Sequence, residues 1–184
     1  MLTLSPGPHH DDTYNPEGAS YMATKSRSSA ARSKTPDAIA LLKADHRQVE
    51  EWFSQFDKTS SKSKKQQLAA RICDALTVHT AIEEEIFYPA FIEATGDKDT
   101  HHEAVVEHAG AKKLIADIQK LSSSDDYFDA KVTVLSEMIK HHVKEEEQPG
   151  GMFAEAKKSD MDLAALGEQM QDRKKELQAQ AQAA

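Results

Sequence analysis

Four stretches of this sequence carry apolar residues at helical spacing, and each places a histidine on its apolar face. Residues that recur every three or four positions lie on one side of an α-helix, which is the side that a folded protein buries. The first two faces are Ile39, Leu42, His46, Val49, Phe53, Phe56 and Leu68, Ile72, Leu76, His79, Glu83, Ile86, Ala90. The other two are Ala104, His108, Ala111, Ile115, Ile118 and Phe128, Val132, Leu135, Ile139, His142, Glu146. The chain must therefore bury polar side chains within a helical core.

The periodic stretches and their stop signals predict helices over residues 37–57, 64–94, 100–121 and 125–148. Thr35 is the expected cap of the first helix, and Gly96 is the expected end of the second. Thr100 and Glu103 fit a capping box at the start of the third helix. Because the connections are short, consecutive helices should be antiparallel neighbours. We expect an all-α, up-down-up-down four-helix bundle over residues 37–154.

Different compositions flank the predicted bundle. Residues 1–36 mix Ser, Thr, Ala, Pro and Gly without apolar periodicity, so we expect a disordered tail in which Met22 is an alternative start to Met1. His9, His10, Asp11 and Asp12 are expected to be solvated there rather than to bind metal. Residues 155–184 predict a polar C-terminal helix, and its thin apolar stripe leaves open whether it docks on the bundle or on a partner.

Charge and hydropathy exclude some functions. The net charge of -8 argues against nucleic-acid binding, and no apolar run reaches the roughly 18–20 residues of a membrane span. Cys73 is the single cysteine, which excludes an internal disulfide and fits a reducing compartment. We therefore expect a cytoplasmic protein in which Cys73 is a small buried side chain rather than a redox thiol.

The polar residues on the four faces have the chemistry of a metal site. Buried carboxylates are costly without a counter-charge, and buried imidazoles need partners for both nitrogens. His79 with Glu83, and His142 with Glu146, are spaced so that both side chains project from one helix face. His46 and His108 are 62 residues apart, while His79 and His142 are 63 apart, which indicates a helical hairpin used twice. We predict a paired metal site with the donors His46, His79, Glu83, His108, His142 and Glu146.

Several neighbouring residues allow alternatives. His141 with Glu145 competes with His142 and Glu146, but that register would place Lys131 in the core, so we favour His142. The neighbouring carboxylates can orient the imidazoles, although we expect them to be solvated surface: Glu84, Glu107 and Glu145. Tyr88 is expected first as a core residue and, as an alternative, as a hydroxyl near the metals. His101 is expected to be an exposed residue at a helix start.

Four segments together make the chain resemble the hemerythrin-like HHE cation-binding family over about Asp37 to Phe153. They are "LLKADHRQVEEWF", "HTAIEEEIFYPAF", "EHAGAKKLI" and "HHVKEEE", in this order. The resemblance implies a four-helix bundle with a non-haem di-iron centre, and roles in oxygen binding, oxygen or redox sensing, or iron handling. By residue-by-residue match, the six predicted donors take the ligand positions, with Glu83 and Glu146 as bridges.

The chain departs from the oxygen-carrying members of that family at two places. Ala104 stands where they have a further histidine. Residues 148–154 are rich in Gly and Pro and lack the Phe-Pro continuation that relatives usually have after the fourth-helix motif. Both departures favour sensing or iron handling over reversible oxygen carriage, and neither removes a predicted metal ligand.

Imidazole and carboxylate donors suit iron, with zinc or manganese as alternatives. We expect two iron ions with an oxide or hydroxide bridge, and open positions for dioxygen, another small diatomic molecule or peroxide. The expected role is binding rather than catalysis. The alternatives are a di-iron enzyme that scavenges peroxide or nitric oxide, and an interaction module with a structural metal. The sequence leaves the protein partner and the oligomeric state undecided.

Overall fold

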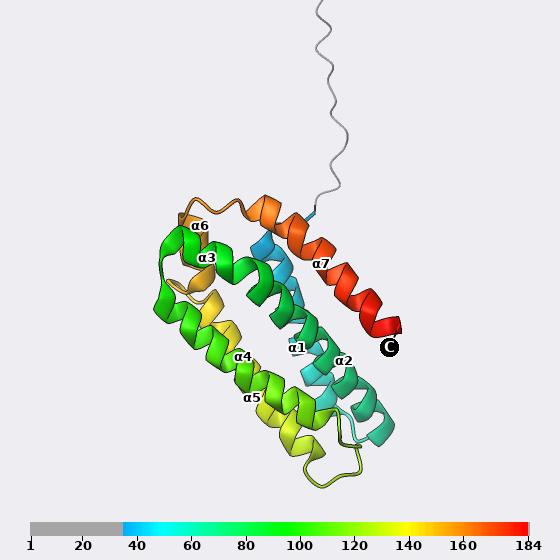
Figure 1. The fold of residues 1–184 in the computed structure, drawn as a ribbon. Coiled ribbons are helices and arrows are strands. Elements are labelled where there is room, and N and C mark those ends of the chain that lie inside the picture. Colours follow the sequence, from blue (N-terminus) through cyan, green and yellow to red (C-terminus); the bar gives the residue numbers. More distant parts are fainter. Residues whose placement is uncertain (1–34, 184) are drawn as a thin grey trace, which may run out of the picture. The chain divides into compact units, whose positions relative to one another are not determined.

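The computed structural model describes residues 35–183, and these residues form helices without any strand. Four long helical arms pack as a bundle in which consecutive arms run antiparallel (Figure 1), so the predicted fold class is confirmed. The predictions for the tail, including Met22 and the His9–Asp12 cluster, lie outside the described residues. The helices are α1 (Ala38–Lys58), α2 (Lys62–Ile82), the π-helical turn η1 (Glu83–Phe87), α3 (Tyr88–Thr95), α4 (Lys98–Ile118), α5 (Phe128–Glu147), α6 (Met152–Lys158) and α7 (Leu163–Ala183).

Aspartates cap the starts of two bundle helices. The Asp37 side chain accepts a hydrogen bond from the Ala40 N–H at 2.8 Å, so Asp37 and not Thr35 is the cap of α1. Asp97 accepts from the Thr100 N–H at 3.1 Å, and α4 begins two residues before the predicted capping box. The second arm ends as predicted at Gly96, whose φ of 71° is easily adopted only without a Cβ.

The buried side chains form two apolar layers along the bundle. One layer lies toward the α1–α2 turn and includes Phe53, Phe56, Ile72 and Phe128. The other lies toward α6 and includes Leu42, Phe87, Phe91 and Phe153. Along each helical arm, the buried histidines and glutamates come between the residues of one apolar layer and those of the other. The polar side chains therefore form a band inside the core.

The second arm is one helix interrupted by η1. Pro89 has no N–H to donate to the carbonyl of Glu85. One residue earlier the helix widens, and the Tyr88 N–H bonds to the carbonyl of Glu83, five residues back, rather than four residues back as in an α-helix. This adds one residue to the turn and shifts the buried face. Ile86 and Ala90, predicted on the core face, are only partly buried, whereas Phe87 and Phe91 are fully buried.

The C-terminal segment holds two helices rather than the one expected. Helix α6 buries Met152, Phe153 and Ala156 at the end of the bundle. Helix α7 packs along α1 and α2 (Figure 1), where Met170 is fully buried and Arg173 donates to Glu85 at 2.6 Å. The apolar stripe of α7 therefore docks on the chain's own bundle.

Gly167 sets how closely α7 approaches the start of α1, which makes it a test of this docking. A Cβ at Gly167 would lie 2.4 Å from the Pro36 carbonyl oxygen and 2.8 Å from the Ala38 nitrogen. Since backbone atoms cannot move aside cheaply, Gly167→Ala should destabilise the chain by about 1–3 kcal/mol, measured by urea unfolding.

Gly110→Ala is the matched control, because its new Cβ would meet only the mobile end of the Met138 side chain. This substitution lies within α4 and should leave stability equal or higher, since alanine favours helix. Equal stabilities for Gly167→Ala and the unchanged chain would contradict the docked position of α7.

Candidate metal centre

The six predicted donors come together in the polar band of the core. The donors are His46 on α1, His79 on α2, Glu83 at the first position of η1, His108 on α4, and His142 and Glu146 on α5. Each is at most 4% exposed. Four helical arms thus contribute polar side chains to one site that is closed to bulk water.

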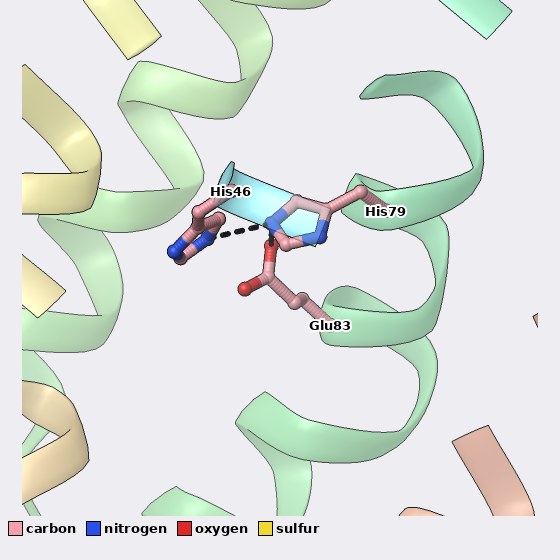
Figure 2. Close-up of side chains that lie close together, drawn as sticks. All are labelled: His46, His79 and Glu83. Carbon is pink, nitrogen blue, oxygen red and sulfur yellow. Dashed lines mark hydrogen bonds and ion pairs between the residues drawn. The ribbon is translucent and has the colours of Figure 1, made fainter. Parts of the chain in front are cut away.

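The four imidazoles form two pairs that meet through their Nε2 atoms. His46 Nε2 lies 3.1 Å from His79 Nε2, and Figure 2 shows these two rings converging above Glu83. His108 Nε2 lies 3.3 Å from His142 Nε2. Each pair therefore directs two nitrogen lone pairs, or their protons, at one point.

The two glutamates each reach both histidine pairs. Glu83 Oε2 lies 3.2 Å from His79 Nε2 and 3.4 Å from His108 Nε2. Glu146 Oε2 lies 3.4 Å from His46 Nε2, and Glu146 Oε1 lies 3.6 Å from His142 Nε2. Each carboxylate therefore lies between the two histidine pairs.

The unsatisfied atoms at this site fit a cation. Both carboxylate oxygens of Glu83, which is fully buried, and Oε2 of Glu146 accept no hydrogen bond. Buried carboxylate oxygens without partners are rare in folded proteins. Donor atoms of His46, His79 and Glu83, and of Glu83, His108 and His142, lie within 4.8 Å of one another. These nitrogen and oxygen donors suit iron, manganese or zinc, so the residues present fit bound metal cations.

A carboxylate also faces the outer nitrogen, Nδ1, of each of the four donor histidines. Glu147 lies 2.8 Å from His46 Nδ1, and Asp45 lies 3.6 Å from His79 Nδ1. Glu84 lies 3.0 Å from His108 Nδ1, and Glu107 lies 2.7 Å from His142 Nδ1. At hydrogen-bond distance, as for His46, His108 and His142, such a carboxylate holds the proton on Nδ1 and leaves Nε2 free to bind a metal. Asp45 is farther from His79, whose Nδ1 has no hydrogen-bond partner.

Only part of this outer set was expected from sequence. Glu84 and Glu107 were predicted to be solvated surface, and that was wrong, because both contact a buried imidazole. Asp45 and Glu147 were missed. The signal that identifies them is adjacency, since each precedes or follows a predicted ligand in the chain and serves the histidine of a neighbouring helix.

The pKa values of the two buried carboxyl groups are shifted in opposite directions. Burial raises the pKa of Glu146 well above its usual range, and the charge of Glu83 raises it further. Burial also opposes the charge of Glu83, but the histidines beginning with His79 outweigh it and lower its pKa. Tyr88 is fully buried and donates its hydroxyl to Glu146 Oε1 at 3.3 Å. The tyrosine thus has both roles considered for it, in the core and beside the donors.

The histidines also differ in their affinity for protons. Burial, with a contribution from the charge of His79, lowers the pKa of His46 to about 4. Burial opposes protonation of His79 and His142 too, but it is outweighed by Glu83 and Asp45 for His79 and by Glu107 and Glu146 for His142. The pKa values of both are therefore raised above 6.5.

Other candidate residues lie outside the six. The His141 side chain is 62% exposed and pairs with Glu107 and Glu145, so the register that favours His142 is the observed one. His101 is partly buried, with its ring at the edge of Tyr88, and is not the exposed residue expected. Cys73 is buried, and burial raises its pKa to about 12, in keeping with a small core side chain.

Residues 148–154, which depart from the usual Phe-Pro continuation of the family, close one side of the site. The Phe153 ring stacks on the His46 ring with a centroid distance of 5.9 Å and an interplanar angle of 7°. Phe153 is 2% exposed. The different sequence after Gln148 therefore still supplies an aromatic cover for the histidines.

Comparisons with known proteins agree with this architecture. Residues 37–149 match the family described as Hemerythrin HHE cation binding domain. A protein from Nostoc sp. described as a DNA nickase is 30% identical over 107 residues, which are 58% of this chain and 30% of that protein's length. The crystal structure of a hemerythrin HHE cation binding domain-containing protein from Mycobacterium kansasii aligns with a TM-score of 0.66 and 21% identity, covering 80% of this chain and 91% of that one. None of the helices in residues 35–183 combines the length and apolarity of a membrane span.

Adjacent histidines on α5 give a direct test of the donor set. His142→Ala removes a buried Nε2 from the centre and should abolish binding of at least one metal ion, as measured by elemental analysis after desalting. His141→Ala removes an exposed ring and should leave the tightly held metal unchanged. The reverse outcome would assign the donors to His141 and Glu145.

Cation binding should weaken as pH falls, because protons compete for the same nitrogens. The raised pKa values of His79 and His142 keep them protonated to a higher pH than a free histidine, so the loss of affinity should begin above pH 6.5. Calorimetric titrations with Mn²⁺ in buffers of different ionisation enthalpy should show proton release at neutral pH. A pH-independent affinity between 6 and 8 would contradict this assignment.

Proposed function

This chain belongs to the hemerythrin HHE cation-binding domain family, and we propose that it binds two iron ions and serves in oxygen or redox sensing or in iron handling. The observation that carries the proposal is that Glu83 and Glu146 each contact one histidine of each pair. The proposed ligands are the six buried donors His46, His79, Glu83, His108, His142 and Glu146. The division into a bundle over 37–154 and an appended segment over 155–184 remains part of the proposal.

The side chains around the donors are suited to hold redox-active ions away from water. A bound iron pair would supply one-electron steps between ferrous and ferric states. The Glu84, Glu107 and Glu147 carboxylates hold three of the imidazoles in one orientation, and Asp45 lies near the fourth. Phe153 and Tyr88 cover the site. Each carboxylate adds negative charge near the donors, which favours the higher charge state of a bound cation.

Two features favour sensing or iron handling over reversible oxygen carriage. Ala104 supplies no donor at the position where oxygen carriers of this family have a histidine, so one ion would have fewer protein ligands. In addition, Lys174 of α7 forms an ion pair with Asp45, and Asp45 faces His79. A charge change at the centre would reach α7 through these two contacts, which is a route from metal state to a surface helix.

Other functions remain alternatives to this proposal. A di-iron enzyme that scavenges peroxide or nitric oxide would use the same donors, and a metal-stabilised interaction module would use zinc without redox chemistry. The named activity of the Nostoc relative belongs to a protein of which this chain matches 30%, and we keep the prediction of no nucleic-acid partner from the net charge of -8. A cytoplasmic location is likewise part of the proposal.

Exposure of the ferrous protein to air tests the proposed function. Anaerobic titration of the metal-free chain with Fe²⁺, followed by desalting, should leave two tightly held ions per chain, one for each of the two buried donor triads. Air should then convert the colourless ferrous protein to a coloured ferric form in a stopped-flow spectrometer. Removal of oxygen should not restore the ferrous spectrum unless a reductant is added.

Ala104→His in the same assay should lengthen the life of any oxygen adduct, since it adds an imidazole on the core face of α4. A colourless protein that binds one zinc ion, with an absorption spectrum that does not change on exposure to air, would favour the metal-stabilised interaction module. Full recovery of the ferrous spectrum on deoxygenation would mean reversible carriage and would overturn the sensing proposal.

A further inference from the structure

A second group of metal-binding side chains lies outside the inner six donors. It consists of Glu107 on α4 with His141 and Glu145 on α5, and one donor atom of each lies within 4.8 Å of the others. His141 Nε2 is 3.2 Å from Glu145 Oε1 and 3.4 Å from Glu107 Oε1. One imidazole nitrogen with two carboxylate oxygens is a donor set for a first-row divalent cation, with water in the remaining positions.

These three side chains are within reach of solvent. The side chain of His141 is 62% exposed, that of Glu145 is 34% exposed and that of Glu107 is 21% exposed. A cation held here would therefore exchange with the surrounding solution, unlike one held among side chains that are at most 4% exposed.

A small cavity borders both the carboxylates of this outer group and the inner centre. Its volume is about 30 Å³, which is enough for a water molecule or a cation. Glu103, Glu107 and Glu145 line it together with the inner donors His142 and Glu146. Glu146, which is 2% exposed and has an Oε2 that accepts no hydrogen bond, is therefore a buried inner donor in the wall of this cavity.

Two residues in the wall of this cavity, Glu107 and Ala104, bear on whether a cation can pass between the two groups. Glu107 faces both sites, because its Oε1 lies near His141 while its Oε2 is 2.7 Å from Nδ1 of the inner His142. Ala104 also lines the cavity, and its single methyl group leaves open the space that a larger side chain would fill.

We propose that Glu107, His141 and Glu145 form an outer site that captures a divalent cation and passes it through the cavity beside Ala104 to the inner centre. Capture rests on the outer group alone, whereas the transfer step rests on the proposed inner metal pair. The carboxylates attract the hydrated cation, and His141 exchanges for part of its water. The cation keeps its charge throughout, so no oxidant or reductant takes part.

The test follows Co²⁺ uptake by the metal-free full-length chain, using visible absorption in a stopped-flow spectrometer. The double variant His141→Gln/Glu145→Gln should load the inner centre on the order of ten-fold more slowly, since electrostatic steering changes association rates by such factors. It should reach the same final inner occupancy, and equilibrium dialysis should show the loss of one weakly held Co²⁺. Ala104→Leu should also load slowly because it fills the cavity, but it should keep the weakly held ion.

The control Glu51→Gln/His102→Gln removes the same residue types from exposed positions elsewhere and should load like the unchanged chain. Unchanged loading in the His141/Glu145 variant would overturn the transfer role, and an unchanged number of weakly held ions would overturn the outer site. A failure of the proposed inner centre looks different, because the unchanged chain and His142→Ala would then bind Co²⁺ identically.

Discussion

The burial of two carboxylates and four imidazoles at one level of a helical core is the constraint on which this fold depends. Removing charged groups from water is expensive unless partners replace the solvent. The chain supplies those partners from two directions, with the Nε2 atoms and carboxylates facing inward and a further carboxylate behind every imidazole. The apolar layers on either side exclude water from the band, which strengthens each of these interactions.

The outer carboxylates form a closed ring around the bundle. Asp45 of α1 contacts His79 of α2, and Glu84 of η1 contacts His108 of α4. Glu107 of α4 contacts His142 of α5, and Glu147 of α5 contacts His46 of α1. The two halves of the ring have the same pattern, with one carboxylate just before a histidine and one just after a glutamate. This repetition extends the similarity of the two hairpins beyond the spacing of the inner donors.

The periodicity of the sequence predicted much of the fold and of the inner site. The core faces of α1, α4 and α5 are those observed, because apolar spacing in a regular helix reports directly on burial. The prediction was wrong after Glu83, where Pro89 and the π-helical turn change the register. Asp45 and Glu147 were missed because their roles depend on the rotation of neighbouring helices, which a one-dimensional pattern does not contain. The docking of α7 was undecided for the same reason, because a narrow apolar stripe in the sequence does not show which surface covers it.

The π-helical turn lets this arm carry one residue more than a regular helix with the same core face would hold. An α-helix turns by about 100° per residue, so the third and seventh positions after Glu83 in a regular helix lie on its own face. Removing one residue between Glu83 and Phe87 would bring Phe87 and Phe91 to those positions, return the arm to a regular helix and leave both rings on the core face. Related sequences that lack the wider turn should therefore align here with a gap of one residue.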